Sequence, residues 1–195
     1  ADGHERSDER KAHGGGICEV RHRDGEQKPN NQPSAKSEDT FRWAGENGFN
    51  LMTLPYMYGT PDFLEKNVGV YKEALSQTGH GKGEVLGKFH IYVTDSLDQA
   101  VRDTEPHLKN YHAAHKAADP NRETVLRSRT DFASEIEKGF IIAGDPQRCI
   151  DAIHRWQEEV GLTTMSGTFH FGGMPQEMAL KNIRLFAERV MPAFI

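Results

Sequence analysis

Strand-like runs with glycine or proline at their ends predict three strands along the chain. They cover residues 49–54, 88–94 and 163–171. Runs of this length between turn residues are typical of strands in a parallel sheet. A further apolar stretch, at 140–143, is shorter and is not counted among the strong strands.

Helical patterns fill the intervals between these strands, and several of their ends are marked by the residues that helix termini prefer. Ser37 and Asp145 are predicted N-caps, Pro61 and Pro146 stand at first helical positions, and Gly161 is the predicted left-handed glycine after a helix. The resulting order is helix, strand, helix, strand, helical excursion, helix, strand, helix. Such alternation predicts an α/β fold with parallel strands and helical crossovers.

The segment Gly161–Ile195 contains one complete unit of strand, glycine turn and helix. Its strand ends at the Gly172-Gly173 pair, which we interpret as a tight turn because no third glycine completes a dinucleotide fingerprint. The amphipathic helix that follows stops at Pro192. Because α/β folds place ligands beyond the carboxyl ends of their strands, function is expected at this turn's end of the molecule.

Composition narrows the class of protein. A length of 195 residues suffices for one domain but is short of the roughly 250 residues of a complete eight-unit barrel. The net charge of -5, without a basic stripe, disfavours nucleic-acid binding. No apolar run approaches the ~18 residues of a membrane span, and the N-terminus does not resemble a signal peptide. Cys18 and Cys149 are far apart and form no metal pattern, so we expect a reduced, cytoplasmic setting.

Residues 1–36 are predicted to be an irregular or remodelled N-terminal segment, in which 17–23 is a weak candidate for an edge strand. Residues 37–195 are predicted to form the folded part. A polar helical excursion at about 103–138 interrupts it and is a candidate lid.

Ser37 and Thr40 are the first candidate ligand-binding residues, because two hydroxyls lie three residues apart at a predicted helix N-terminus. Free backbone N–H groups and the helix dipole favour a phosphate there, and Lys36 or Arg42 could add positive charge. Two acidic residues beside them are unfavourable to a dianion. From the residues alone, the simpler interpretation that Ser37 only caps the helix is favoured.

Two further groups of side chains have both a functional and a structural interpretation. Tyr56, Met57 and Tyr58 follow a predicted strand, where an aromatic loop suits a flat ring system, although loop packing explains them equally well. His90 and His170 lie on predicted strands and could be acid–base groups, but satisfied core histidines are commoner.

His112 and His115 stand three residues apart on a predicted helix. No carboxylate–histidine set accompanies them, so a solvated helix face is favoured over a metal site, and no metal is predicted.

Taken in order, four segments resemble the C-terminal half of the bacterial luciferase-like flavin monooxygenase family. They are residues 37–52, 87–100, 141–153 and 171–192. The resemblance implies a (β/α)8 TIM barrel of the luciferase-like type, incomplete at its N-terminal half. It also implies reduced FMN, or alternatively F420, with O2 and a small organic substrate. A flavin reductase would supply the reduced flavin, and a homo-oligomer such as a dimer is expected.

The resemblance also assigns cofactor-binding roles to particular residues. Ser37 and Thr40 align with the family's flavin-phosphate loop, whereas Lys36 stands where the luciferase pattern has an acidic residue. Thr53, Leu54 and Pro55 align with a strand end near the flavin ring, and Tyr56 follows in the same loop. No catalytic residue is assigned, because the strands that carry the family's active-site histidine are missing here.

The leading hypothesis from the sequence is a flavin-dependent monooxygenase. The alternatives are a flavin-binding protein without catalysis, for which the short non-fluorescent flavoproteins of luminous bacteria are a precedent, and a subunit that completes a barrel with another chain.

Overall fold

The computed structural model describes residues 37–58, 61–118 and 131–194, which belong to one compact unit spanning Gln32–Ile195. Lys36, Cys18 and the possible edge strand at 17–23 lie outside the described residues, as do the side chains of Met57 and Tyr58.

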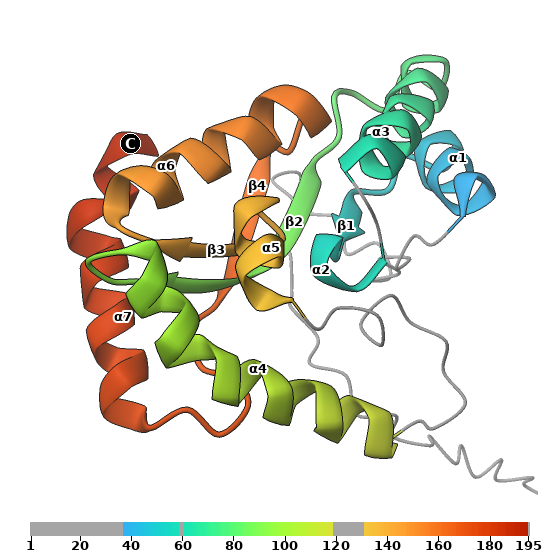
Figure 1. The fold of residues 1–195 in the computed structure, drawn as a ribbon. Helices are drawn as coiled ribbons and strands as arrows, with labels where there is room; N and C mark the ends of the chain where they lie inside the picture. The colour runs from blue at the N-terminus through green and yellow to red at the C-terminus, as the bar shows by residue number, and fades with distance from the viewer. Residues whose placement is uncertain (1–36, 59–60, 119–130, 195) are drawn as a thin grey trace, which may run out of the picture. The chain divides into compact units, whose positions relative to one another are not determined.

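Helices and strands alternate through this part of the chain (Figure 1). The strands are β1 (Leu51–Thr53), β2 (Val85–Val93), β3 (Ile141–Gly144) and β4 (Thr164–Thr168). The helices are α1 (Glu38–Glu46), α2 (Pro55–Tyr58), α3 (Pro61–Ser76), α4 (Leu97–Ala118), α5 (Phe132–Glu137), α6 (Pro146–Arg155) and α7 (Gln176–Arg189). A π-helical turn, Trp156–Val160, continues α6, and a 3-10 turn, Met191–Phe194, follows α7.

The sheet is parallel throughout the described residues, and β2 is its central strand. Residues 85–87 of β2 pair with β1, residues 90–93 pair with β3, and residues 86–90 pair with β4. Residues 86 and 87 pair with both β1 and β4, and residue 90 pairs with both β3 and β4. Because a strand has only two edges, β4 occupies one edge of β2, and β1 and β3 share the other. The prediction of three strands missed β3, whose four residues are all buried and therefore show no alternation.

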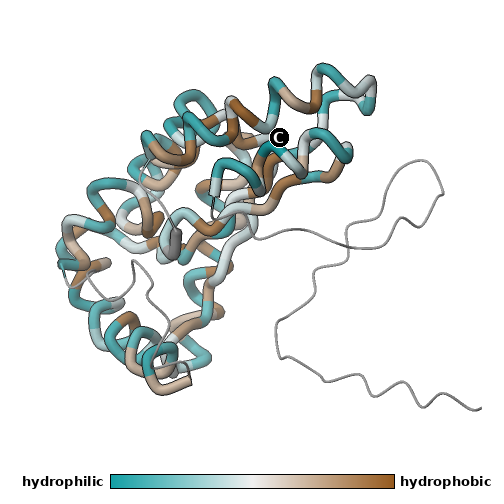
Figure 2. The backbone as a smooth tube through the Cα atoms, turned by 90° about the vertical axis from the view of Figure 1, so that its right-hand side faces the viewer, coloured by the Kyte–Doolittle hydropathy of each residue, from teal (hydrophilic) through white to brown (hydrophobic). Residues whose placement is uncertain are grey.

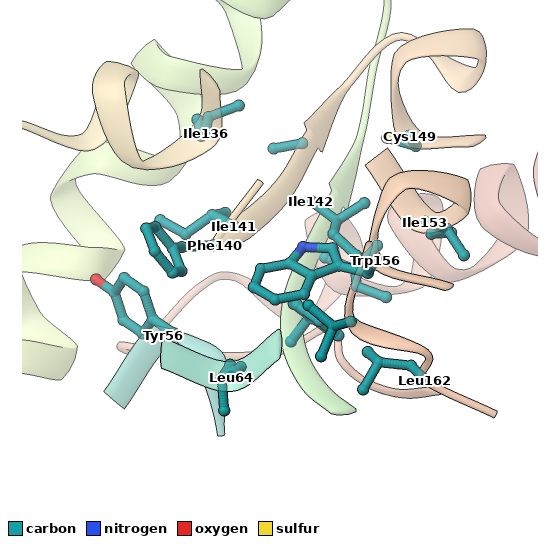
Figure 3. Packing of buried hydrophobic residues seen from close by; sticks show 14 of the residues in the cluster. Tyr56, Leu64, Ile136, Phe140, Ile141, Ile142, Cys149, Ile153, Trp156 and Leu162 are labelled. Carbon is teal, nitrogen blue, oxygen red and sulfur yellow. The ribbon is translucent and has the colours of Figure 1, made fainter. Parts of the chain in front are cut away.

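One face of this sheet is apolar and packs under helices. Phe89 meets Trp156 with ring centroids 5.3 Å apart, and a side chain at Gly87 would run into Leu162. Ile91 extends toward Gly167 of β4 on the same side. Figure 3 shows the buried side chains of this region, with the Trp156 indole reaching from its helical turn toward the strands. Along the backbone, hydrophobic and hydrophilic stretches alternate on the helices, as amphipathic helices require (Figure 2).

Helices α1 and α3 pack side by side and run in the same direction (Figure 1). Their starts are joined by an ion pair between Glu38 and Lys66, 3.0 Å apart, and their ends meet where Gly45 lies against the Tyr71 carbonyl. A side chain at Gly45 would overlap that backbone. Since α3 follows β1 in the chain, the start of α1 lies on the side of the sheet where β1 ends.

The capping residues in the sequence correctly predicted the ends of the helical segment that contains α6. Asp145 is its N-cap, accepting a hydrogen bond from the Arg148 amide at 3.1 Å, and Pro146 is its first residue. Gly161 follows with a left-handed φ of 76°. The excursion after residue 103 was predicted less well, because α4 is one continuous helix from Leu97 despite an internal Pro106.

Asn182 of α7 connects this helix to the sheet. Its side-chain oxygen accepts from the Val93 amide at 2.8 Å, and its side-chain nitrogen donates to the Ile91 carbonyl at 2.6 Å. The residue is fully buried, so these bonds replace those that water would otherwise make. Among the described residues, no helix is long and apolar enough to cross a membrane.

Candidate functional site

The second face of the sheet carries polar side chains, and this distinguishes it from the face under α6 and α7. Lys88 is aligned with Ser166, and His90 with Thr168, across the β2–β4 pair. Side chains at aligned positions of parallel strands point to the same side, which here is the side of Tyr92. Lys88 is exposed, Ser166 and Thr168 are half-buried, and His90 is buried. The face therefore offers an ammonium, two hydroxyls and an imidazole.

His90 lies at the inner end of this polar face, inside a set of aromatic rings from three separate segments. Tyr56 of α2, Tyr111 of α4 and Phe171 after β4 all meet the imidazole edge-to-face, with centroids 5.1, 4.7 and 4.8 Å away. We call His90 and these three rings the His90 cage. Its members come from positions up to 115 residues apart, so the fold alone assembles it.

Burial sets the protonation state of His90. Loss of solvent lowers the pKa of its imidazole to about 3, and the nearby positive charges of Lys88, His112 and His115 act in the same direction. His90 is therefore neutral at physiological pH. Its Nε2 is buried and makes no hydrogen bond to the described residues. An unpaired buried nitrogen costs roughly 1–3 kcal/mol, so its presence here calls for a reason other than stability.

Helix α4 lies across the polar face and is attached at several points. The Tyr92 hydroxyl donates to Asp103 at 3.0 Å, and His112 hydrogen-bonds the Tyr56 hydroxyl. Burial and the Asp103 carboxylate both raise the pKa of Tyr92, which stays protonated as a donor. His112 and His115 are half-buried against aromatic rings, so the prediction that they lie on a solvated helix face was wrong.

The glycine turn after β4 holds α4 in place. Gly172 and Gly173 have φ values of 57° and 74°, which confirms the predicted tight turn. The Gly172 carbonyl accepts from Asn110 at 3.2 Å and lies 3.4 Å from His107 Nδ1. His170, the second candidate histidine, is exposed and has no place in the His90 cage.

The start of α1 brings together the two hydroxyls of the predicted phosphate site. Ser37 precedes the helix in an extended conformation, and its Oγ lies 3.0 Å from Thr40 Oγ1. Its side chain makes no capping hydrogen bond, which argues against the interpretation that Ser37 is only a cap. The exposed Ser37 and half-buried Thr40 thus remain available to a ligand at the positive end of the helix.

One carboxylate near this helix start forms ion pairs with two cations. Glu38 pairs with Lys66 at 3.0 Å and with Arg42 at 2.9 Å. Hydrogen bonding and attraction, first from Lys66 and then from Arg42, lower the pKa of Glu38. Arg42 and Lys66 are therefore already engaged by Glu38.

The remaining predicted cofactor-binding residues lie at the end of β1 but differ in what they offer. Thr53 is buried, and its hydroxyl donates to the Leu86 carbonyl at 3.2 Å, so the sheet already uses that group. Leu54 is half-buried. Tyr56 was predicted in a loop, but it belongs to the short helix α2 and is 2% exposed, inside the His90 cage.

Lys88, Ser166 and Thr168 were not singled out from the sequence. A signal was present, because polar and apolar residues alternate along 88–93, with Lys88, His90 and Tyr92 in phase. That period of two predicts one polar and one apolar face of the strand.

A separate cavity of about 430 Å³ lies beside α5 and α6. It is lined by charges of both signs, including Glu137, Asp151, Arg148 and Arg155. Because these charges oppose one another, the cavity shows no preference for an anion or a cation.

No known family profile matches the sequence, and no curated protein matches it. Solved structures do share its fold. The monooxygenase RslO1 from Streptomyces bottropensis aligns with a TM-score of 0.68 and 21% identity, over 83% of this chain and 47% of its own. The oxygenating constituent of 3,6-diketocamphane monooxygenase from Pseudomonas putida, solved in complex with FMN, aligns with a TM-score of 0.58 and 16% identity over 80% and 45%.

The chain has the fold of part of a luciferase-like barrel. It spans under half the length of these two monooxygenases. Flavoprotein 390 aligns over a larger share of its own chain, 66%, with a TM-score of 0.52 and 14% identity over 82% of this one. In a closed barrel of this type the polar face of β2 and β4 would line the interior.

Proposed function

We propose that this chain is the flavin-binding part of a luciferase-like monooxygenase, which uses reduced flavin and O2 to oxygenate a small organic substrate. The observation that carries the proposal is the partial luciferase-like barrel together with the paired hydroxyls of Ser37 and Thr40 at a helix start. Neighbours with this fold include flavin-dependent monooxygenases, one of them solved with FMN.

The residues present fit a flavin mononucleotide. Its phosphate would be held by Ser37 and Thr40 at the start of α1, where the helix dipole favours an anion. Its ring would lie toward the polar face, where Lys88 and Ser166 offer hydrogen bonds. Thr53 and Leu54 would contribute the wall at the end of β1, with Tyr56 behind them.

The bound reduced flavin would supply the electrons for oxygen activation. The chain's own contribution is binding, orientation and exclusion of water. Tyr56 and Phe171 make the inner end of the face apolar, which protects a reactive centre from solvent. Residues 103–118 of α4, which cover that end, fall within the excursion predicted as a lid.

A flavin-binding protein without catalysis is the second candidate. It is favoured by the alignment with flavoprotein 390, of which this chain covers two thirds, compared with under half of the monooxygenases. A subunit that completes a barrel with another chain is a variant of this candidate, in which the two chains share the active site.

Equilibrium binding to the full chain tests the cofactor. FMN, anaerobically reduced FMN and F420 are titrated separately, and ligand fluorescence is followed. We expect saturable binding of FMN in at least one redox state, and binding of none of the three would overturn the proposal. Oxygen consumption with a supplied flavin reductase and a panel of small organic substrates then separates the monooxygenase from the non-catalytic candidate, which predicts no substrate-dependent uptake.

A further inference from the structure

We propose that His90 is the residue that hydrogen-bonds the flat ring of the bound flavin, and that Tyr111 occupies the place of that ring when no flavin is bound. This inference rests on the proposed function and adds a residue to it that neither the sequence resemblance nor the fold comparison assigns.

The first step is the unused hydrogen-bonding capacity of His90. Its Nε2 is buried and makes no hydrogen bond to any of the residues the structure describes. The side chain is 6% exposed and stands on the polar face, aligned with Thr168. Neither solvent nor the described residues satisfy the nitrogen, and a ligand on the polar face can do so.

The second step is the chemistry of the surroundings. Three aromatic rings meet the His90 imidazole edge-to-face, with centroids within 5.1 Å. Such walls suit a planar ring rather than an aliphatic chain or a metal ion, and no group of three or more metal-ligating side chains is present in the described residues. A neutral imidazole can either donate to or accept from the polar edge of that ring.

The third step identifies the side chain that must move. Tyr56 and Phe171 are both buried and lie within three residues of the ends of β1 and β4, so their segments are fixed by the sheet. Tyr111 instead stands on α4, a helix that covers the sheet, and its side chain can turn away while the helix stays attached. Tyr111 also makes the shortest ring contact with His90, at 4.7 Å, and is half-buried.

The test measures dissociation constants of FMN and riboflavin for the full chain and four variants. His90→Phe keeps a ring but removes both nitrogens, and His90→Gln restores a polar group. Tyr111→Ala removes the blocking ring, while Tyr111→Phe keeps it and removes only the hydroxyl. The melting temperature of each variant shows whether it folds.

We expect His90→Phe to weaken both ligands by the same factor, about tenfold, because both carry the same ring. His90→Gln should recover part of the loss. Tyr111→Ala should strengthen binding of both ligands several-fold, whereas Tyr111→Phe should leave it unchanged. Ser37→Ala is the matched control for the phosphate end of the ligand. It should weaken the binding of FMN and leave the binding of riboflavin unchanged.

Unchanged affinity in a folded His90→Phe variant would overturn the inference. So would equal losses in His90→Phe and His90→Gln accompanied by lowered melting temperatures, because that pattern indicates a structural role. If the unaltered chain binds FMN but not riboflavin, the ring contributes no affinity; the inference fails and the proposed function stands. If it binds neither of these nor F420, both fail.

Discussion

The backbone carbonyl of His107 lies directly against Gly172, leaving no room for a side chain. A Cβ at Gly172 would overlap that oxygen, whereas a Cβ at Gly173 would meet nothing within 4 Å among the described residues. The turn after β4 and the middle of α4 are thus in backbone contact. This contact holds α4 over the His90 cage.

Replacing Gly172 with alanine should therefore release α4, and replacing Gly173 should not. Both glycines have positive φ, so each alanine carries about 1–2 kcal/mol of backbone strain. Only Gly172→Ala adds the collision with His107, and we expect a total loss of 3 kcal/mol or more by order of magnitude. Urea unfolding measures the loss, and hydrogen exchange of amides 107–118 locates it. Equal losses of unfolding free energy in the two variants would show that backbone strain alone causes the destabilisation.

Glu38 should restrain phosphate binding at the start of α1. Its carboxylate holds both Arg42 and Lys66, and their attraction keeps its pKa low and the group charged. Glu38→Gln should therefore strengthen FMN binding several-fold at low salt and leave riboflavin binding unchanged. Asp39→Asn is the matched control, since it removes a neighbouring negative charge without freeing either cation. If Asp39→Asn has the same effect as Glu38→Gln, the release of Arg42 and Lys66 contributes nothing to FMN binding.

His90 should make the folded chain less stable as the pH falls. Burial lowers the pKa of His90 to about 3 in the folded state, compared with 6.5 for a solvated imidazole, and Lys88, His112 and His115 add to the shift. Between those values the unfolded chain binds the extra proton, so stability is complete above pH 6.5 and declines toward pH 3. The expected slope is up to about 1.4 kcal/mol per pH unit from this group.

The measurement is urea unfolding at several values between pH 7 and 4.5 for the unaltered chain, His90→Phe and His90→Gln. Both variants lack the titrating imidazole and should show a shallower dependence than the unaltered chain. A difference of zero between the three curves would mean that His90 does not titrate differently in the folded and unfolded states.

The sequence predicted features that depend on neighbours in the chain. Asp145, Pro146 and Gly161 act within one helical turn, so their residue types alone mark the ends of α6. The parallel α/β fold followed in the same way from alternating patterns. The strand β3 was missed because its pairing with β2 depends on residues some 50 positions away, while its own four residues carry no period.

The candidate site was predicted only in part, for the same physical reason. Ser37 and Thr40 are three residues apart on one helix, and their hydroxyls do meet. The His90 cage, in contrast, is made by rings from α2, α4 and the turn after β4, and no local pattern relates Tyr111 to Phe171. The desolvation of His90 is a property of that assembly, so only the fold could reveal it.

Asn182 should be among the most sensitive positions for stability outside the site. Its side chain bonds the Val93 amide and the Ile91 carbonyl in a fully buried position, joining α7 to β2. Asn182→Leu keeps the size but leaves both backbone groups without these partners, and we expect a loss of about 3 kcal/mol from two unsatisfied groups. Asn182→Asp retains the acceptor for Val93 but buries a carboxylate against the Ile91 carbonyl, so it should lose at least as much. Lys181→Ala, at the exposed neighbouring position, should change stability by less than about 0.5 kcal/mol. Urea unfolding at pH 7 measures all three, and a cost at Lys181 equal to that at Asn182 would show that the helix, rather than this side chain, carries the contact.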